Sequence, residues 1–216
     1  MSLAEDLTKQ KQTAAAKFAA ERLATMEGAT AELRASGIEG LALKKSDNTP
    51  GVTLTNPNGQ SISLAQLYER APAIVIFYRG GWCPYCNLTL RAYQGLLPEI
   101  RAAGVNLVAI TPELPDNTLN TAQKNELAFE VLSDPDLEAA AGFGLAFELP
   151  EDLAALYIKN GNDLRLINGT SRFSLPVPAT YVIGRDGVIA YAHVDVDYRN
   201  RAEPNDALEA AKRLLA

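Results

Sequence analysis

Apolar and polar positions follow one another along the chain in a pattern typical of strands separated by helices. Four short runs rich in β-branched and aromatic residues predict buried strands at 73–77, 105–110, 129–132 and 179–183. The second run follows a helical stretch, so it is expected to lie parallel to the first with a right-handed crossover. This order predicts an α/β fold, with a central mixed β-sheet and helices on both faces.

Turn residues add two hairpins to this pattern. The first spans 52–64 around Asn58-Gly59, and the second spans 179–193 around Asp186-Gly187. Helical segments are expected at 64–68, 117–125, 136–141, 151–158 and 205–215. The polar, turn-rich stretch 159–174 is expected to be a partly exposed insertion.

The first 40 residues predict a helical N-terminal extension, which leaves 41–216 as the main domain. Ser2 and Glu5 fit a capping box, and the helix that follows is expected to run to about Met26, with Gly28 as its stop. A second short helix is expected at 30–36. The loose apolar stripe of the first helix fits either docking against the domain or a dimerisation arm in a homodimer.

The chemistry of the chain is concentrated in one stretch, because its only two cysteines, Cys83 and Cys86, lie three positions apart. A predicted strand and a short glycine loop precede them, and a helical segment follows. This is the layout of a thioredoxin-type redox site. Helix N-termini favour negative charge, so the pKa of Cys83 is expected to be lowered. We therefore predict Cys83 as the attacking nucleophile and Cys86 as the resolving thiol.

The neighbours of the two cysteines fit the same arrangement. Pro84 suits the first helical position, where an N–H group is not needed. The glycine pair Gly80-Gly81 allows tight turning and leaves room for a partner to approach. Pro98 is expected to kink or restart the helix near residue 97.

Composition and charge exclude several other classes of protein. The net charge of −6 argues against nucleic acid or an anionic membrane as a partner. No apolar run approaches the roughly 20 residues that span a bilayer, and the N-terminus lacks the pattern of a secretory signal. A zinc site is not expected, because the chain has one histidine and no second cysteine pair. With no cysteines left for structural bridges, a cytoplasmic location is expected.

With these motifs in order, the chain resembles the peroxiredoxin-like branch of the alkyl hydroperoxide reductase/thiol-specific antioxidant family, which has the thioredoxin fold. The resemblance rests on 76–86, 131–135, 142–144 and 177–187, and it covers about 52–216. It implies that Val177-Pro178 is a cis peptide facing the dithiol, with the Val177 backbone free to bind a substrate. It also implies no bound cofactor and an external thiol reductant, from a thioredoxin or glutathione system.

The chain departs from the family pattern around its cysteines. Typical peroxiredoxins have a proline seven residues and a threonine or serine three residues before the reactive cysteine, where this chain has Ile76 and Gly80 if Cys83 is that residue. They also have an arginine at the position of Pro178. The peroxide-orienting groups are therefore displaced or absent, and the Cys-Pro-Tyr-Cys sequence itself is typical of glutaredoxin.

Other residues near the motif have open roles. Arg79 either replaces the lost cation beside the thiolate or pairs with a surface carboxylate. Trp82 is expected to pack beside the site rather than to contact substrate, and Tyr85 to be exposed towards a partner protein. His193 is expected to be a surface or packed residue. The charged residues of 195–201 fit a solvated face, with a substrate-entrance role as the alternative.

Three functions are consistent with these residues. The resemblance favours a thiol peroxidase that reduces hydrogen peroxide or organic hydroperoxides through a Cys83/Cys86 dithiol–disulfide cycle. The local motif fits a general thiol–disulfide oxidoreductase that acts on protein or glutathione disulfides. The third alternative is a non-enzymatic redox sensor. A thioredoxin or glutaredoxin is the expected reducing partner of the enzyme.

Overall fold

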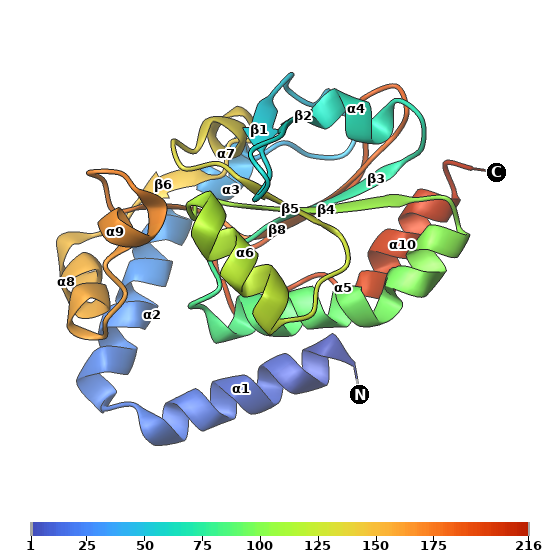
Figure 1. Ribbon diagram of the computed structural model, residues 1–216. Helices are drawn as coiled ribbons and strands as arrows, with labels where there is room; N and C mark the ends of the chain where they lie inside the picture. The colour runs from blue at the N-terminus through green and yellow to red at the C-terminus, as the bar shows by residue number, and fades with distance from the viewer. Residues whose placement is uncertain (1, 216) are drawn as a thin grey trace.

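A seven-stranded mixed sheet forms the centre of the molecule (Figure 1). The computed structural model describes residues 2–215. In spatial order the strands are β2 (Ser61–Ser63), β1 (Thr53–Thr55), β5 (Glu130–Ser133), β4 (Asn106–Thr111), β3 (Ala73–Phe77), β8 (Ala179–Ile183) and β9 (Ile189–Val194). Strands β3, β4 and β5 are parallel, and β8 is antiparallel to both β3 and β9. The predicted α/β fold, its four buried strands and both hairpins are confirmed.

Helices and loops cover both faces of this sheet. Because successive side chains of a strand point to opposite faces, β3 contributes Ile74 and Ile76 to one core cluster and Val75 and Phe77 to another. The first cluster lies under α5 (Pro84–Ala102) and α10 (Pro204–Lys212). The second is covered by helices that include α3 (Ile38–Leu41), α4 (Leu64–Tyr68) and α7 (Glu138–Gly142).

The segment predicted as a polar insertion has more structure than its composition indicates. Strand β6 (Ala146–Glu148) pairs with β7 (Ser174–Pro176), and the chain between them forms α8 (Glu151–Lys159) and α9 (Leu164–Asn168). Leu164 is fully buried in a third core cluster. The predicted helix at 151–158 is confirmed as α8. The prediction missed β6, β7 and α9, because these elements are only three to five residues long and their packing joins residues far apart in sequence.

Two long helices form the N-terminal part, with bounds that differ from those predicted. Helix α1 (Leu3–Lys17) begins with the predicted capping box, and α2 (Ala20–Ala35) continues through Gly28. Gly28 is therefore not a helix stop. Glycine inside a helix costs only about 1 kcal/mol relative to alanine, which the packing of α2 on α8 offsets. The chain instead turns at Phe18, whose backbone is extended.

Both N-terminal helices dock against their own chain. Leu3 and Leu7 of α1 are buried in the cluster beneath α5 and α10, and the Ala4 N–H donates to Glu203 Oε1 at 2.6 Å. In Figure 1, α1 runs along the α5 side of the molecule and α2 rises beside α8. In the single chain, α1 and α2 therefore pack against the main domain, as the docking alternative predicts.

Helix α5 is continuous across Pro98, so the predicted restart near Leu97 is wrong. The helix buries Leu90, Tyr93, Leu97 and Ile100 along one face. This packing extends on both sides of the proline and outweighs the roughly 3 kcal/mol that an interior proline costs.

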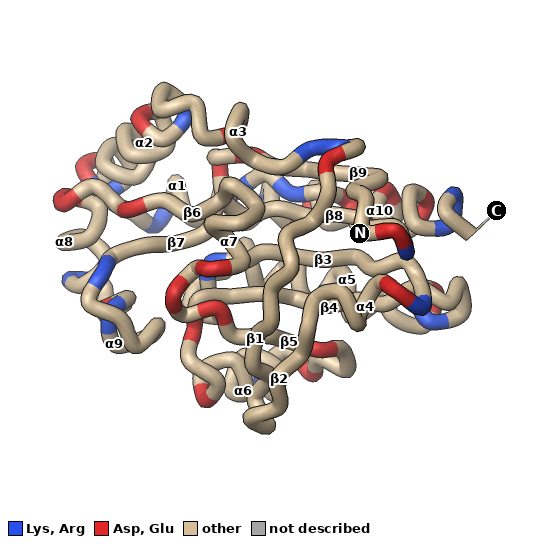
Figure 2. Tube along the Cα trace, turned by 90° about the horizontal axis from the view of Figure 1, so that it is seen from above, with Lys and Arg blue, Asp and Glu red and all other residues tan. Residues whose placement is uncertain are grey.

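Charged residues lie on the outer helices and loops, as Figure 2 shows, whereas the central strands β3 and β8 carry none. Acidic and basic side chains are interspersed on these outer segments. Within residues 2–215, no helix combines the length and the apolar character needed to cross a membrane.

Candidate active site

The two cysteines lie at the start of α5, directly after the loop that follows β3. Cys83 is the N-cap of the helix and Pro84 is its first residue, as the sequence predicts. Both thiols are free and buried, Cys83 with 2% of its surface exposed and Cys86 with none. The redox motif is thus placed at the positive end of a 19-residue helix.

The glycine loop before Cys83 is packed tightly against its own chain. Gly80 has a φ of +147°, and a Cβ there would lie 2.3 Å from Trp82 Nε1. A Cβ on Gly81 would lie 1.9 Å from Thr121 Oγ1 of α6 (Pro115–Lys124). The space beside both glycines is therefore occupied by side chains of the same chain. The prediction that this space is open to an approaching partner is wrong.

We predict that Gly81→Ala lowers the free energy of unfolding by about 1–3 kcal/mol, because overpacking against the buried Thr121 forces the loop or α6 to shift. Chemical denaturation monitored by circular dichroism measures this change. Adding Thr121→Ala should recover part of the loss, since it removes the closest atom. An unchanged midpoint in Gly81→Ala would show that the loop does not rely on this contact.

The two thiols share a hydrogen bond that shifts their pKa values in opposite directions. The hydrogen bond with Cys86 and burial raise the pKa of Cys83 well above that of an ordinary thiol. Burial opposes ionisation of Cys86 as well, but the Cys83 hydrogen bond and the cation of Arg201 outweigh it and lower the pKa of Cys86. The prediction of a lowered pKa for Cys83 is therefore wrong, because the Cys83 S–H and the cation of Arg201 favour charge on its neighbour.

Arg201 is a cation in direct contact with the dithiol. It lies in the loop between β9 and α10, and its Nη2 is 3.6 Å from Cys86 Sγ. The sequence places it in a charged segment whose default interpretation is a solvated face. The structure instead brings it into contact with a sulfur 115 positions away in sequence, so the solvated face does not describe this residue.

Arg79 is buried, with 3% of its surface exposed, so it is not the surface ion pair of the alternative prediction. Its guanidinium lies over the rings of Tyr198, Trp82 and Tyr157 at 4.3, 5.0 and 5.6 Å, and it donates to the Tyr157 hydroxyl. Among residues 2–215, no carboxylate forms an ion pair with it. A buried charge requires compensation, and the groups that favour the charged form of Arg79 are Tyr157 first and then Cys83, Tyr198 and Cys86.

Glu113, which the sequence analysis did not select, holds the glycine loop from the opposite side. Its Oε2 accepts from the Gly81 N–H at 2.9 Å, while the Gly81 carbonyl accepts from Asn87 Nδ2 at 2.8 Å. Burial raises the pKa of this carboxyl to about 7, against the effect of the Gly81 N–H, and the charge of Cys86 raises it further. The carboxyl therefore titrates near neutral pH within the loop that carries the thiols.

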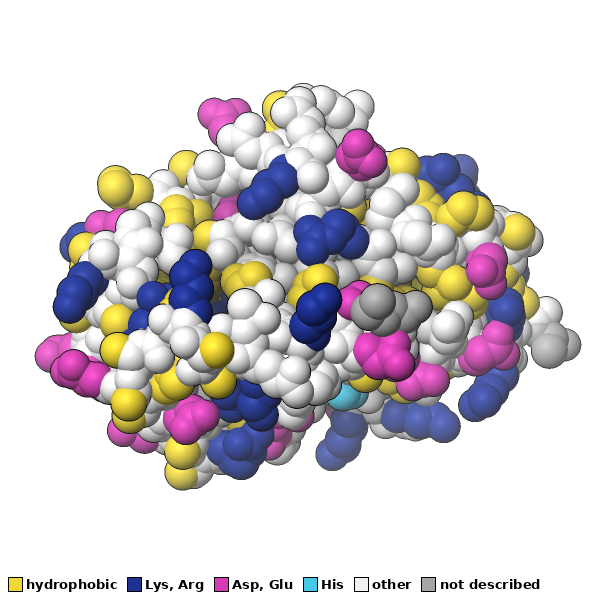
Figure 3. All heavy atoms as spheres, turned by 90° about the horizontal axis from the view of Figure 1, so that it is seen from below, with side chains coloured by type: hydrophobic (Ala, Val, Ile, Leu, Met, Phe, Trp, Pro, Cys, Tyr) yellow, Lys and Arg dark blue, Asp and Glu magenta, His cyan; other side chains and the backbone are white. Residues whose placement is uncertain are grey.

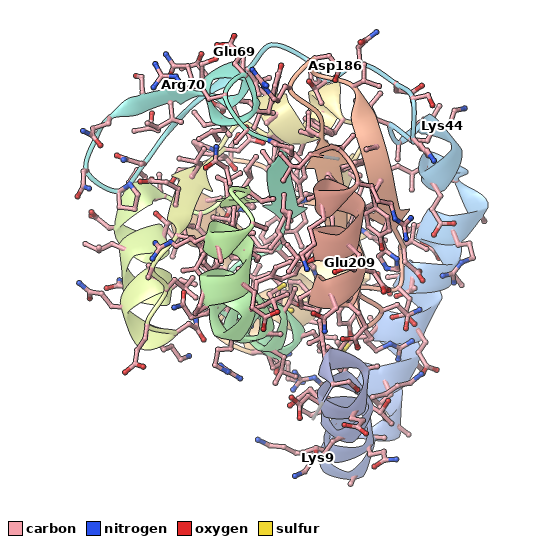
Figure 4. All side chains as sticks on the ribbon, turned by 90° about the vertical axis from the view of Figure 1, so that its right-hand side faces the viewer. Lys9, Lys44, Glu69, Arg70, Asp186 and Glu209 are labelled. Atoms are coloured by element: carbon pink, nitrogen blue, oxygen red, sulfur yellow. The ribbon has the colours of Figure 1, made fainter. Side chains whose placement is uncertain are left out.

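This raised pKa predicts a pH-dependent stability. Between pH 4.5 and about 7 the folded protein holds a proton on Glu113 that the unfolded chain has lost, so the free energy of unfolding falls as pH rises, by on the order of 3 kcal/mol. Glu113→Gln should remove this slope and be the more stable protein at pH 8. Urea denaturation from pH 4 to 8 measures it, with Glu69→Gln, which points outward (Figure 4), as control. Parallel curves for wild type and Glu113→Gln would contradict the assignment.

The late proline does not have the geometry that the family resemblance implies. The Val177–Pro178 peptide is trans, so the predicted cis bond is wrong. The Val177 N–H donates to the Leu145 carbonyl at 2.8 Å and is not free for a substrate. Pairing of β7 with β6 just before Val177 fixes the chain in this extended path. Pro178 lines a cavity that Arg79 and Tyr198 also line.

A cavity of about 170 Å³ lies over Cys83, between the start of α5 and the turn that joins α1 to α2. Cys83 is in its wall, together with Trp82, Pro84 and Tyr85. Trp82 packs on Tyr157 with ring centroids 5.2 Å apart, as expected, and also faces this cavity. Tyr85 is buried against Tyr198 instead of exposed to a partner. Cys83 is thus the sulfur that faces open space.

Comparison with known proteins identifies the family to which the chain belongs. The family model described as "AhpC/TSA family" matches residues 46–192, more than half of the chain. The chain belongs to the AhpC/TSA family. The match to this family confirms the resemblance predicted from 76–86, 131–135 and 177–187.

Individual relatives of this AhpC/TSA protein are distant. Rv2521 of Mycobacterium tuberculosis, which carries a provisional peroxiredoxin name, is 29% identical over 154 residues, covering 71% of this chain and 87% of that protein. Peroxiredoxin Bcp of Escherichia coli is 27% identical over 103 residues, covering 48% and 65%. The crystal structure of peroxidoxin BcpB from M. tuberculosis superposes with a TM-score of 0.62 at 18% identity, covering 80% of this chain and 98% of that one.

The AhpC/TSA match includes both cysteines and Arg79 but ends before Arg201 and begins after α1 and α2. His193, the first residue after that match, lies in β9, where burial lowers its pKa. The site thus combines a family core with a cation and two helices from outside the matched region. The sequence selected the residues of the site from Arg79 to Cys86, whereas Glu113 and the residues of the two N-terminal helices carried no signal that marked them.

Proposed function

We propose that the protein is a thiol peroxidase that reduces hydrogen peroxide or organic hydroperoxides through a dithiol–disulfide cycle of Cys83 and Cys86. The observation that carries this proposal is the dithiol at the N-terminus of α5, with Cys86 contacted by Arg201 and Cys83 facing a cavity. Membership of the AhpC/TSA family, with peroxiredoxins among the relatives, supports the same reaction.

In the first step the Cys83 thiol passes its proton to the Cys86 thiolate through their hydrogen bond, and Cys83 Sγ attacks the terminal peroxide oxygen. The O–O bond breaks, Cys83 becomes a sulfenic acid, and the leaving alkoxide or hydroxide takes a proton from water. The sulfur is oxidised by two electrons and the peroxide is reduced by two. Arg79, a buried cation beside the pair, stabilises the charge on the leaving oxygen.

In the second step the Cys86 thiol attacks the Cys83 sulfenic acid. The S–O bond breaks, a disulfide forms, and the hydroxyl leaves as water with the thiol proton. An external thiol then returns both cysteines to the reduced state. Pro84 and Cys83 form the helix start that presents both sulfurs on one turn, and Trp82 and Tyr85 pack around them.

Burial of the dithiol favours a peroxidase over a reductase of protein disulfides. Cys83 has 2% of its surface exposed and lies beneath the α1–α2 turn. A hydroperoxide is small enough for the cavity, whereas a protein disulfide reaches the sulfur only if the helices move. The same cover makes a small thiol, such as glutathione, the first reductant to test and thioredoxin the second. A dithiol kept reduced between turnovers is consistent with a cytoplasmic protein.

A paired assay tests the proposal. Purified protein is given hydrogen peroxide and cumene hydroperoxide with either a glutathione or a thioredoxin system, and is assayed in parallel for reduction of insulin and of a glutathione mixed disulfide. We expect hydroperoxide consumption with at least one system and negligible disulfide reduction. The reverse result would assign the protein as a disulfide reductase, and inactivity in both assays would leave the redox sensor.

A further inference from the structure

The cavity over Cys83 is built in large part by the N-terminal helices, which lie outside the matched family region. Helix α1 contributes Ala14, and the segment that follows it contributes Phe18, Arg22 and Met26. A cavity of about 150 Å³ in another protein holds benzene, so 170 Å³ admits a group of that size. The helices therefore add a chamber for an organic group beside the reactive sulfur.

The walls of this chamber are mainly apolar and aromatic. The side chains of Phe18 and Met26 face Trp82, Pro84 and Tyr157 across it. A second cavity of about 210 Å³ shares Met26, Arg79, Tyr157 and Tyr198 with the first. The two cavities thus meet at Arg79 and provide apolar space on both sides of it. Hydrogen peroxide uses none of this area, whereas an aromatic ring or alkyl chain buries its surface there.

The same chamber carries two arginines that form no ion pair with a carboxylate among residues 2–215. Arg22 lies over the Phe18 ring at 3.5 Å and donates to Asn160 Oδ1 at 3.1 Å, and its Nε is buried without an acceptor. The buried Arg79 Nε also has none. Within residues 2–215, neither arginine forms an ion pair; the cavity's one lining carboxylate, Glu27, pairs with Arg199 at 3.6 Å.

These cations stand out in a chain with a net charge of −6. Figure 3 shows Lys and Arg side chains among hydrophobic ones on the half of this face that holds α1 and α2. A guanidinium with free donors recognises a carboxylate through charge-assisted hydrogen bonds. The combination fits a ligand with an apolar body and an acidic group.

We propose that this chamber selects organic hydroperoxides that carry a carboxylate, with the apolar body between Phe18 and Trp82 and the carboxylate bound by Arg22. This inference rests on the proposed peroxidase function and adds a substrate class to it. Arg22 acts as a specificity residue: it binds the substrate away from the peroxide, whereas Cys83 performs the chemistry.

A matched pair of substrates tests the proposal on the full chain. Cumene hydroperoxide and its para-carboxylated derivative differ only in the acidic group. We expect kcat/KM to be about tenfold higher for the carboxylated compound, mainly through a lower KM. In Arg22→Gln this ratio should fall to about one. Arg22→Lys should keep part of it, and Lys9→Gln, whose side chain points away from α1 into solvent (Figure 4), should keep all of it.

Three results would overturn the proposal, and a fourth would overturn the peroxidase function on which it rests. A ratio near one in the wild type, or a ratio unchanged in Arg22→Gln, removes the carboxylate site. A change confined to KM for the thiol reductant assigns the chamber to the reductant instead. If the wild type reduces no hydroperoxide, the peroxidase function fails by itself. Calorimetric titration with the unreactive 4-isopropylbenzoate then tests the chamber alone, since binding must be lost in Arg22→Gln but not in Lys9→Gln.

Discussion

Cys83→Ser is expected to abolish hydroperoxide turnover, lowering kcat/KM by at least about 10³-fold. Serine keeps the size of the side chain at the helix N-cap but supplies no sulfur that can take up the peroxide oxygen. Turnover is measured by coupled oxidation of the reductant, and a thermal unfolding curve shows whether the variant is folded.

Cys86→Ser is the matched comparison, because it also replaces a buried thiol on the same helical turn. It should stop the catalytic cycle after one turnover, since the sulfenic acid at Cys83 has no neighbour to condense with. A single turnover in Cys83→Ser, with loss of all reaction in Cys86→Ser, would reverse the assigned roles.

Arg201→Gln is expected to raise the lower pKa of the dithiol by about one unit or more and to reduce turnover at pH 6 about twofold or more. The guanidinium 3.6 Å from Cys86 Sγ lowers the pKa of that thiol, and an opposite charge at this range shifts a pKa by about one to three units. Because the lost rate reflects protonation, activity should recover as pH rises. The pH profile of kcat/KM and thiolate absorbance at 240 nm measure both effects.

Two variants separate this electrostatic role from a structural one. Arg201→Lys retains the charge and should restore part of the acidic limb of the profile. Arg213→Gln removes an exposed arginine beyond α10 and should leave the profile unchanged. A uniform loss of rate at every pH in Arg201→Gln, with the thiolate absorbance unaltered, would assign Arg201 to packing alone.

Sequence patterns predicted the parts of the fold that depend on interactions between neighbouring residues. β-branched runs, Asn-Gly and Asp-Gly turns and the start of α5 at Pro84 all appear where expected, because each depends on a few adjacent residues. Predictions failed where packing over long distances outweighs a local preference. Gly28 and Pro98 are the examples, since buried faces of α2 and α5 carry the helices past both residues.

The candidate site divides in the same way. Cys83 and Cys86 carry a short sequence signal, but which of them holds the charge depends on Arg201, 115 positions away from Cys86. Glu113 reaches Gly81 from the loop after β4, and no motif marks it. The family resemblance placed a cis peptide at Val177-Pro178, and the Leu145 carbonyl instead holds the Val177 N–H in a trans segment. Such contacts depend on the topology and packing of the whole chain, and short sequence motifs do not reveal them.

The location of the first oxidised sulfur tests the central claim most directly. Cys86→Ser and Cys83→Ser are each mixed with one equivalent of hydrogen peroxide in the presence of dimedone, which traps sulfenic acid, and are analysed by peptide mass spectrometry. We expect a dimedone adduct on Cys83 in Cys86→Ser and no adduct on Cys86 in Cys83→Ser. An adduct on Cys86 in Cys83→Ser, or none on Cys83 in Cys86→Ser, would contradict a peroxidase that acts through Cys83.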